Sequence, residues 1–116
     1  MTTYHGSCHC GAIAFDVEGE LQGAVACNCS MCQRKGSLLW FVPRPQLTLK
    51  TPPEAMRSYR FNKHLIAHHF CPTCGIHPFG EGTAPNGAAM AAVNIRCLEG
   101  IELDQVPVQH FDGRAL

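Results

Sequence analysis

The sequence predicts a mostly β protein built from short strands that are joined by turn-rich connections. Two observations support this fold class. Apolar and polar residues alternate along several short segments, which is the period of a half-buried strand. The eight prolines are spread from Pro43 to Pro107 and leave little room for long helices. Because 116 residues is the length of one domain, we expect residues 1–116 to fold as a single unit.

The first half of the chain contains three candidate strands and one helical turn. Residues 11–20 alternate clearly between bounding glycines, which indicates a half-buried strand. Residues 21–27 form a second candidate strand that leads into a group of cysteines. A turn or so of helix is expected at 30–35. Residues 37–43 are apolar and stop at a proline, which is typical of the end of a strand.

The second half continues the same pattern. Residues 46–50 and 55–61 alternate as strands do, and residues 64–70 run directly into a pair of cysteines. The composition of residues 87–95 suits either a helix or a strand. We expect a strand, because the segment follows the turn signal Pro-Asn-Gly and ends in Val-Asn-Ile. A second short helical turn is expected near 101–106.

The charge balance argues against several classes of partner. Nine basic and nine acidic residues cancel, so neither nucleic acid nor an anionic membrane surface is an expected partner. The N-terminal segment MTTYHGSCHC lacks the charged and apolar regions of a secretory signal. No apolar run approaches the roughly 18 residues that a transmembrane helix needs. We therefore expect a cytoplasmic protein, and the sequence does not indicate its oligomeric state.

The eight cysteines are the strongest functional signal in the sequence. Such a density indicates a disulfide framework in a secreted protein, whereas in a cytoplasmic protein it favours metal binding or catalysis. Apart from a lone Cys97, which we expect to be a buried small residue, the cysteines form three closely spaced groups. These groups are Cys8-x-Cys10, Cys27-x-Cys29-x-x-Cys32 and Cys71-x-x-Cys74.

Two of these groups together predict a closed structural zinc site. The segment CPTCG is typical of a zinc-binding turn, in which Gly75 supplies the positive φ at the exit. One such turn supplies two ligands, whereas a structural zinc takes four. Side chains two residues apart on an extended chain point the same way, so the first pair can complete the set. The predicted ligands are Cys8, Cys10, Cys71 and Cys74. Iron in the same site, or metal-free thiols, are the alternatives.

The remaining group of three cysteines predicts a second, labile zinc. Cys27, Cys29 and Cys32 can converge on one metal and leave its fourth position open, which is the arrangement of a catalytic zinc. Such a position can hold a substrate thiolate. Three alternatives stand beside this interpretation. The fourth ligand could be Cys97 or a histidine, Cys29 and Cys32 could form a redox pair with Cys27 as resolving thiol, or the group could be metal-free.

Four segments closely resemble the glutathione-dependent formaldehyde-activating enzyme family, which includes the centromere-protein-V-like proteins. In chain order they are GSCHCGAIAFDVEG, CNCSMCQRKGSLLW, HHFCPTCGIHPFG and VNIRCLEG. The resemblance implies an Mss4-like fold, a tent of several small antiparallel sheets with zinc at their junction. It also implies that the outer pairs hold a structural zinc and that the three-cysteine group holds a more labile one.

The activity implied by the resemblance is the addition of glutathione to formaldehyde, which gives S-hydroxymethylglutathione. We therefore expect a zinc-dependent carbon–sulfur lyase, or thiol-adduct synthase, that acts on glutathione or a related thiol and a small aldehyde. The catalytic site would be Cys27, Cys29 and Cys32. The alternatives are a non-catalytic zinc module that binds or carries glutathione and a zinc-stabilised interaction domain.

Other residues can be placed only loosely from the sequence. Arg34 and Lys35 follow the three-cysteine group and are the first candidates to bind substrate carboxylates, although a solvated basic edge is the alternative. Either Trp40 or Phe41 is expected to form a wall of the pocket. None of the seven histidines is assigned a catalytic role. Further basic candidates for the carboxylates are Arg57, Arg60 and Lys63.

Overall fold

The computed structural model describes residues 2–60 and 66–115. The described chain is mostly β, as the sequence predicted, and none of its helices has the length and apolar character needed to cross a bilayer. Its strands are β1 (Thr2–Ser7), β2 (Ala14–Gly19), β3 (Ala24–Cys27), β4 (Leu39–Pro43), β5 (Leu47–Leu49), β6 (Arg57–Tyr59), β7 (Ala67–Phe70), β8 (Phe79–Thr83), β9 (Ala89–Asn94) and β10 (Val108–Phe111). Its helical segments are α1 (Ser30–Lys35) and the 3₁₀ turns η1 (Arg44–Gln46), η2 (Pro53–Ala55), η3 (Ile95–Cys97), η4 (Leu103–Gln105) and η5 (Gly113–Ala115).

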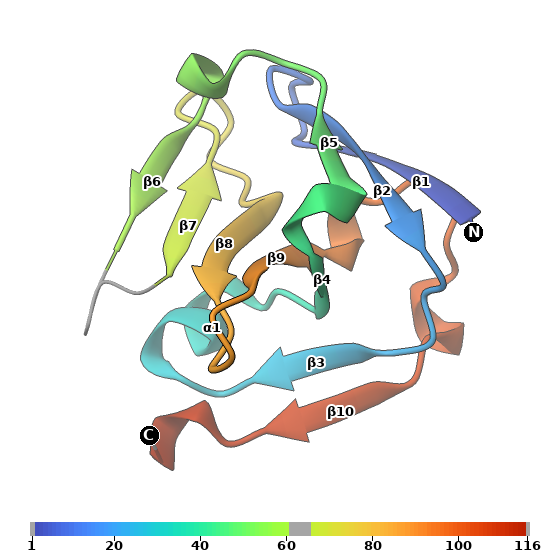
Figure 1. The fold of residues 1–116 in the computed structure, drawn as a ribbon, viewed down its shortest axis with the longest axis vertical. Coiled ribbons are helices and arrows are strands. Elements are labelled where there is room, and N and C mark those ends of the chain that lie inside the picture. The colour runs from blue at the N-terminus through green and yellow to red at the C-terminus, as the bar shows by residue number, and fades with distance from the viewer. Residues whose placement is uncertain (1, 61–65, 116) are drawn as a thin grey trace.

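The strands form two sheets that lean against each other. The smaller sheet has the order β1-β2-β5, and the larger has the order β10-β3-β4-β9-β8-β7-β6. Figure 1 shows the smaller sheet on one side of the molecule, opposite β6, β7 and β8, while β3 and β10 run along the bottom. This arrangement fits the Mss4-like tent. Neighbouring strands are antiparallel except β10 and β3, which form a parallel pair that the sequence did not predict.

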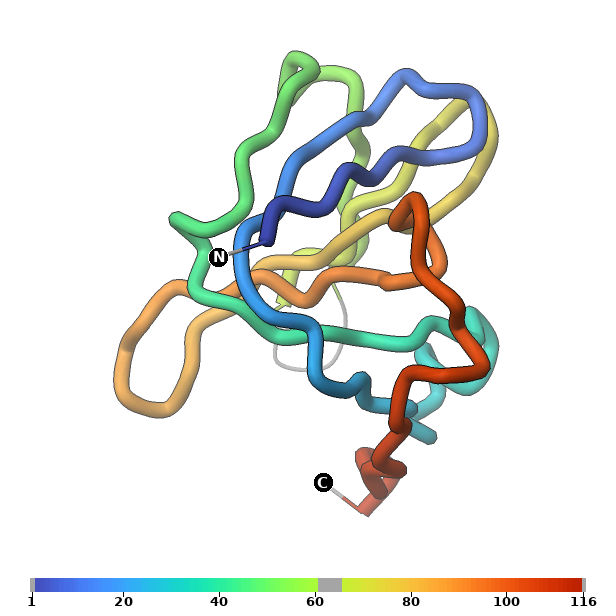
Figure 2. Tube along the Cα trace, turned by 90° about the vertical axis from the view of Figure 1, so that its right-hand side faces the viewer, coloured from blue at the N-terminus to red at the C-terminus, as the bar shows by residue number. Residues whose placement is uncertain are grey.

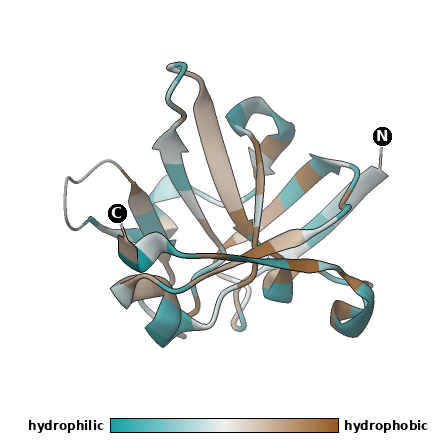
Figure 3. Cartoon of the chain, turned by 90° about the horizontal axis from the view of Figure 1, so that it is seen from below, coloured by the Kyte–Doolittle hydropathy of each residue, from teal (hydrophilic) through white to brown (hydrophobic). Residues whose placement is uncertain are grey.

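The core lies where the two sheets meet. The alternating residues of β2 point into it, and Ile13, Phe15 and Val17 are fully buried. The Phe15 ring lies 5.6 Å from the ring of Phe79 on β8, so this aromatic pair joins the two sheets. Figure 3 shows hydrophobic colour along the strands that cross the middle of the molecule. Burial of these side chains is the main force that holds the sheets together.

Most of the expected elements are present, with shifted ends. The helical turn at 30–35 is α1, and the turn expected near 101–106 is η4. Within the strand expected at 64–70, the structure describes β7, whereas residues 61–65, with Lys63, lie outside the described residues. Three strands were not predicted from the sequence, namely β1, β8 and β10.

Candidate metal centres and active site

The structure brings together the four cysteines that the sequence predicted as structural zinc ligands. Their sulfur atoms all lie within 4.8 Å of one another. The Cys8 and Cys10 sulfurs are 3.8 Å apart, and the Cys10 and Cys71 sulfurs are 3.5 Å apart. Four thiolates around a tetrahedral zinc have sulfur–sulfur spacings of about 3.8 Å, whereas a disulfide needs about 2.05 Å. The geometry therefore fits a four-sulfur metal site, and all eight cysteines are free thiols.

The two ligand loops have the same backbone design. The Cys8 amide donates to the Ile13 carbonyl, and the Cys71 amide donates to the Ile76 carbonyl. In each loop, therefore, the first cysteine forms a backbone hydrogen bond with the residue five positions later. The amides of Ile13 and Cys74 donate to the sulfurs of Cys8 and Cys71, respectively, at 3.4 Å. Amides directed at sulfur favour the thiolate, which is the form that binds metal.

Backbone donors also act on the fourth ligand. Hydrogen bonds from the amides of Ile76 and then Cys10 lower the pKa of Cys74 to about 6. Burial, followed by the charges of Cys8 and Cys74, raises the pKa of Cys97 to about 11, so this thiol lies near the four-cysteine site. Its sulfur lies 3.9 Å from the His77 carbonyl oxygen. Cys97 thus belongs to neither set of ligand atoms.

The three-cysteine group lies at the junction of β3 and α1. Cys27 ends β3, Cys29 is the N-cap of α1, and Cys32 is in its first turn. Their sulfurs lie within 4.8 Å of one another, and no other cysteine, histidine or carboxylate of the described residues joins them. The Cys32 amide donates to the Cys29 sulfur, and the Cys29 amide donates to the Cys27 sulfur, both at 3.4 Å. The arrangement can supply three thiolate ligands to one metal.

The thiols of this group have unequal acidities. Burial, followed by the hydrogen bonds and charges of Cys29 and Cys27, raises the pKa of Cys32 to about 12. Burial opposes ionisation of Cys29 as well, but hydrogen bonds from the Cys32 amide and its thiol lower the pKa of Cys29 overall. Three thiolates at this spacing repel one another, so a bound cation is needed before all three can ionise.

The C-terminal segment, β10 and η5, is paired and hydrogen-bonded to the chain around this group. β10 pairs with β3 so that Phe111 lies opposite Cys27, and Figures 1 and 2 show the two segments side by side. The Asn28 side chain donates to the Asp112 carboxylate at 2.9 Å and accepts from the Arg114 amide at 3.0 Å. A Cβ at Gly113 would meet the Cys27 sulfur at 2.5 Å, so only glycine fits at this close approach.

A cavity of about 670 Å³ opens beside the three cysteines, within the size range of about 300–1,000 Å³ that small-molecule sites have. Side chains from both arms of the larger sheet contribute to its walls. The residues lining it are Val25, Cys27, Cys29, Cys32, Lys35, Ser37, Leu39, Phe41, Ile66, His68, His77, Gly80, Ala92, Gln109, Phe111 and Gly113.

The polar wall of the cavity is formed by Lys35, His68 and His77. The Lys35 ammonium donates to Nδ1 of His68 at 3.3 Å. Nδ1 of His77 lies 2.6 Å from the carbonyl oxygen of His69, which only accepts, so Nδ1 carries the proton. Burial, together with the charge of Lys35, lowers the pKa of both His68 and His77 to about 4. Both rings are therefore neutral at pH 7, and Nε2 of His77 is an acceptor.

This geometry can be compared with known proteins. The family of glutathione-dependent formaldehyde-activating enzymes matches the chain over residues 3–111. The chain belongs to this family. A crystal structure of a Rhodobacter sphaeroides protein is similar at 31% sequence identity and a TM-score of 0.77. The alignment covers 90% of this chain and 99% of that chain, so it includes most of the fold. The membership expected from the sequence is confirmed.

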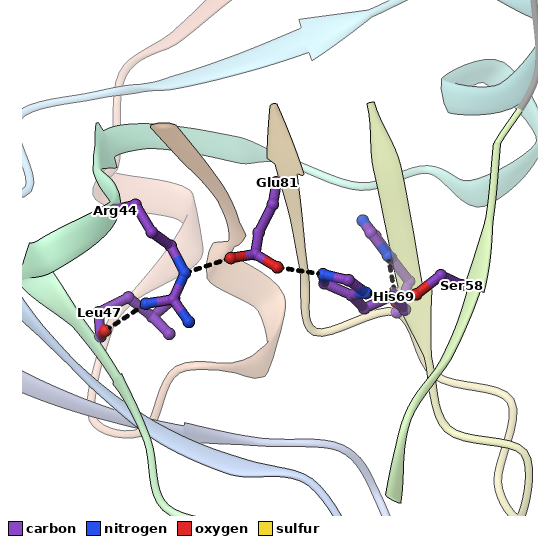
Figure 4. Close-up of polar contacts among 6 residues, drawn as sticks. Arg44, Leu47, Ser58, His69 and Glu81 are labelled. Atoms are coloured by element: carbon purple, nitrogen blue, oxygen red, sulfur yellow. Dashed lines mark hydrogen bonds and ion pairs between the residues drawn. The ribbon is translucent and has the colours of Figure 1, made fainter. Parts of the chain in front are cut away.

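A polar network supports the cavity wall of this family member from behind. Nδ1 of the His69 ring forms a hydrogen bond with the Ser58 hydroxyl at 2.7 Å, and Nε2 forms one with the Glu81 carboxylate at 2.6 Å. Arg44 donates from Nε to the same carboxylate and from Nη1 to the Leu47 carbonyl (Figure 4). The backbone carbonyl of the same residue, His69, accepts from Nδ1 of His77 and so orients the His77 ring in the cavity.

The other residues considered from the sequence now have positions. Lys35 lines the cavity, whereas Arg34 is exposed and donates to the Ser30 carbonyl of its own helix. Trp40 is buried against Tyr4, and Phe41 is the one that lines the cavity. Sequence reasoning did not assign roles to His77, Asn28 or Gly113. The spacing of the cysteines in the sequence was enough to predict them as ligands. The roles of His77, Asn28 and Gly113 follow only from contacts in the folded structure.

Proposed function

We propose that this family member is a zinc-dependent carbon–sulfur lyase, similar to S-(hydroxymethyl)glutathione synthase, that joins a thiol to formaldehyde or another small aldehyde. The observation that carries the proposal is the placement of the three-cysteine group in the wall of a cavity of about 670 Å³. Three ligand atoms at a cavity leave room for a substrate atom at the same metal. Membership of the formaldehyde-activating family supports the same chemistry.

In this proposal Cys27, Cys29 and Cys32 hold the catalytic zinc, and the four-cysteine site holds a structural zinc. Zinc bound by the three thiolates would favour the thiolate form of a substrate thiol and polarise a carbonyl as a Lewis acid. The C-terminal segment, fastened through Asn28, keeps Cys27 in place. The thiol-rich, disulfide-free composition supports action in the cytoplasm, where thiols stay reduced.

Nε2 of His77 is the proposed proton relay. Addition removes the proton from the thiol, forms the bond between sulfur and the carbonyl carbon, and moves the carbonyl π electrons to oxygen. His77 accepts the thiol proton at Nε2 and returns it to that oxygen, so the product is a neutral hydroxymethyl thioether. Because the pKa of His77 is about 4, uptake of the proton requires that bound zinc lower the pKa of the thiol, whereas return of the proton to the oxygen is favoured. The reverse sequence would cleave the carbon–sulfur bond.

The test is the rate at which the zinc-loaded protein converts a thiol and formaldehyde to the adduct. Exchange spectroscopy by NMR measures this rate against the spontaneous addition, first with glutathione. We expect acceleration by the wild type and at least about a hundredfold loss in Cys29→Ser, because loss of one of three ligands should empty the proposed catalytic zinc site. Serine is a good N-cap, so this variant should keep α1 intact.

Cys97→Ser is the matched control, since Cys97 is a ligand at neither cluster. It should keep the wild-type rate. Zinc content, measured in parallel, should fall by one ion per chain in Cys29→Ser and stay unchanged in Cys97→Ser. Full activity in Cys29→Ser would refute the catalytic role of the group. If the protein binds the thiol but does not accelerate its addition to formaldehyde, it is a thiol carrier and not an enzyme.

A further inference from the structure

Three of the four most exposed large hydrophobic side chains among the described residues line the cavity. Phe41, Ile66 and Phe111 are 51%, 48% and 49% exposed, and all three line it. They come from β4, from the start of the segment leading to β7, and from β10, so three separate parts of the chain converge there. Exposed apolar side chains that cluster at a cavity indicate a ligand that covers them.

The deeper walls continue this apolar character. Val25, Leu39 and Ala92 lie on the neighbouring strands β3, β4 and β9 and also line the cavity. Among the described residues of the lining there is no carboxylate and one cation, Lys35. The Lys35 ammonium already donates one hydrogen bond to His68 and has two further donors to offer. The cavity thus has the means to pair with one anionic group.

A polyionic thiol is poorly matched to such walls. Glutathione carries two carboxylates and an ammonium group, and each charge that enters the cavity without a partner loses hydration. Arg34 follows the cysteines in sequence but donates to the Ser30 carbonyl, and Arg96 follows β9 but donates to the Gly36 carbonyl. Neither arginine lines the cavity. The described lining therefore offers no second cation and no acceptor carboxylate.

We propose that the thiol bound at this site has an aromatic or branched aliphatic body and carries no more than one carboxylate. Phe41, Ile66 and Phe111 would cover the apolar body, and Lys35 would pair with the carboxylate. This inference rests on the proposed function for the role of the thiol. It replaces glutathione by a less polar thiol at the same site.

The test compares three thiols for binding to the zinc-loaded protein by isothermal titration calorimetry. They are glutathione, benzyl mercaptan and 4-(mercaptomethyl)benzoate. The two aryl thiols should bind at least about tenfold more tightly than glutathione, as expected when one aromatic ring is removed from water. Phe41→Ser and Phe111→Ser should each weaken aryl thiol binding about fivefold to tenfold. Tyr59→Ser is the matched control, because Tyr59 is also 51% exposed but does not line the cavity.

A second variant tests the charge separately from the packing. Lys35→Met should remove the preference for 4-(mercaptomethyl)benzoate over benzyl mercaptan. This variant keeps the inference testable even if truncation of Phe41 prevents folding. Tighter binding of glutathione than of both aryl thiols, or equal losses in Tyr59→Ser, would overturn the inference.

Failure of the proposed function gives a different result. If no thiol of the three is added to formaldehyde faster than in buffer, the enzymatic proposal fails, while the order of affinities still decides the substrate class. If glutathione is both bound best and converted fastest, the enzymatic proposal stands and the apolar thiol is excluded.

Discussion

At the level of single residues, the two nitrogens of the His77 ring have separate tasks. Nδ1 donates to the His69 carbonyl at 2.6 Å and fixes the ring, while Nε2 is left as an acceptor in the cavity. Burial of the ring, followed by the positive charge of Lys35, lowers the pKa of His77 and disfavours its charged form. A neutral histidine is therefore part of the folded state.

This neutrality predicts a pH dependence of stability. The pKa of His77 is about 4 in the folded protein and about 6.5 in the unfolded chain, so the unfolded chain binds more protons between these values. The stability associated with His77 is complete above pH 6.5 and is lost as the pH falls towards 4. His77→Asn keeps a donor for the His69 carbonyl but does not titrate. Between pH 7 and 4.5 it should lose about 2–3 kcal/mol less unfolding free energy than the wild type.

Denaturant unfolding of both proteins at several pH values measures this difference. His110→Asn is the control, because His110 is exposed on β10 and does not line the cavity. Parallel pH profiles for wild type and His77→Asn would show that His77 is not held neutral by its surroundings.

The backbone at Gly113 lies close to the candidate active site. A Cβ at this position would lie 2.5 Å from the Cys27 sulfur and 3.3 Å from Cβ of Cys29. Gly113→Ala should therefore displace either η5 or the Cys27 sulfur and weaken zinc binding at the three-cysteine group by about tenfold or more. Competition with a coloured chelator measures this affinity. Ala115→Ser, in the exposed part of η5, should bind zinc as the wild type does, and equal affinities for Gly113→Ala would contradict the close approach.

At the level of elements, most of the strands that the sequence predicted have a local pattern of alternating or continuous apolar residues. β2 shows it most clearly, because its buried residues alternate with half-exposed or exposed ones. β1 and β8 contain glycine and polar residues, and β10 is exposed throughout, so none of them has an alternating pattern. These strands form because a neighbour supplies the hydrogen bonds, which local sequence does not record.

In the candidate site, too, some residues could be predicted from local sequence and others could not. Spacing alone grouped the cysteines, because ligands from one turn must be close in sequence. The partners of Asn28 are 84 and 86 residues away, and β10 lies beside β3 through the parallel register that the sequence did not predict. The cavity walls come from strands throughout the chain, so its apolar mouth follows from topology and was not predictable from any one segment.

At the level of the whole molecule, the four-cysteine cluster lies between the two sheets. Cys8 and Cys10 lie in the loop from β1 to β2 of the smaller sheet, and Cys71 and Cys74 lie in the loop from β7 to β8 of the larger one. A metal at this position joins loops that are distant in sequence and adds to the contact between Phe15 and Phe79. Its binding energy is then part of the folding energy of the chain.

If the two clusters hold the zinc ions proposed for them, removal of these ions should have separate consequences. A mild chelator should take the ion of the three-cysteine group and leave the circular dichroism spectrum unchanged, because that group lies at the edge of one cavity. A strong chelator, or Cys71→Ser, should remove the second ion and unfold most of the chain, with a loss of more than about 5 kcal/mol. Cys97→Ser should behave as the wild type in both steps. Loss of both ions without loss of β structure would show that burial alone holds the sheets together.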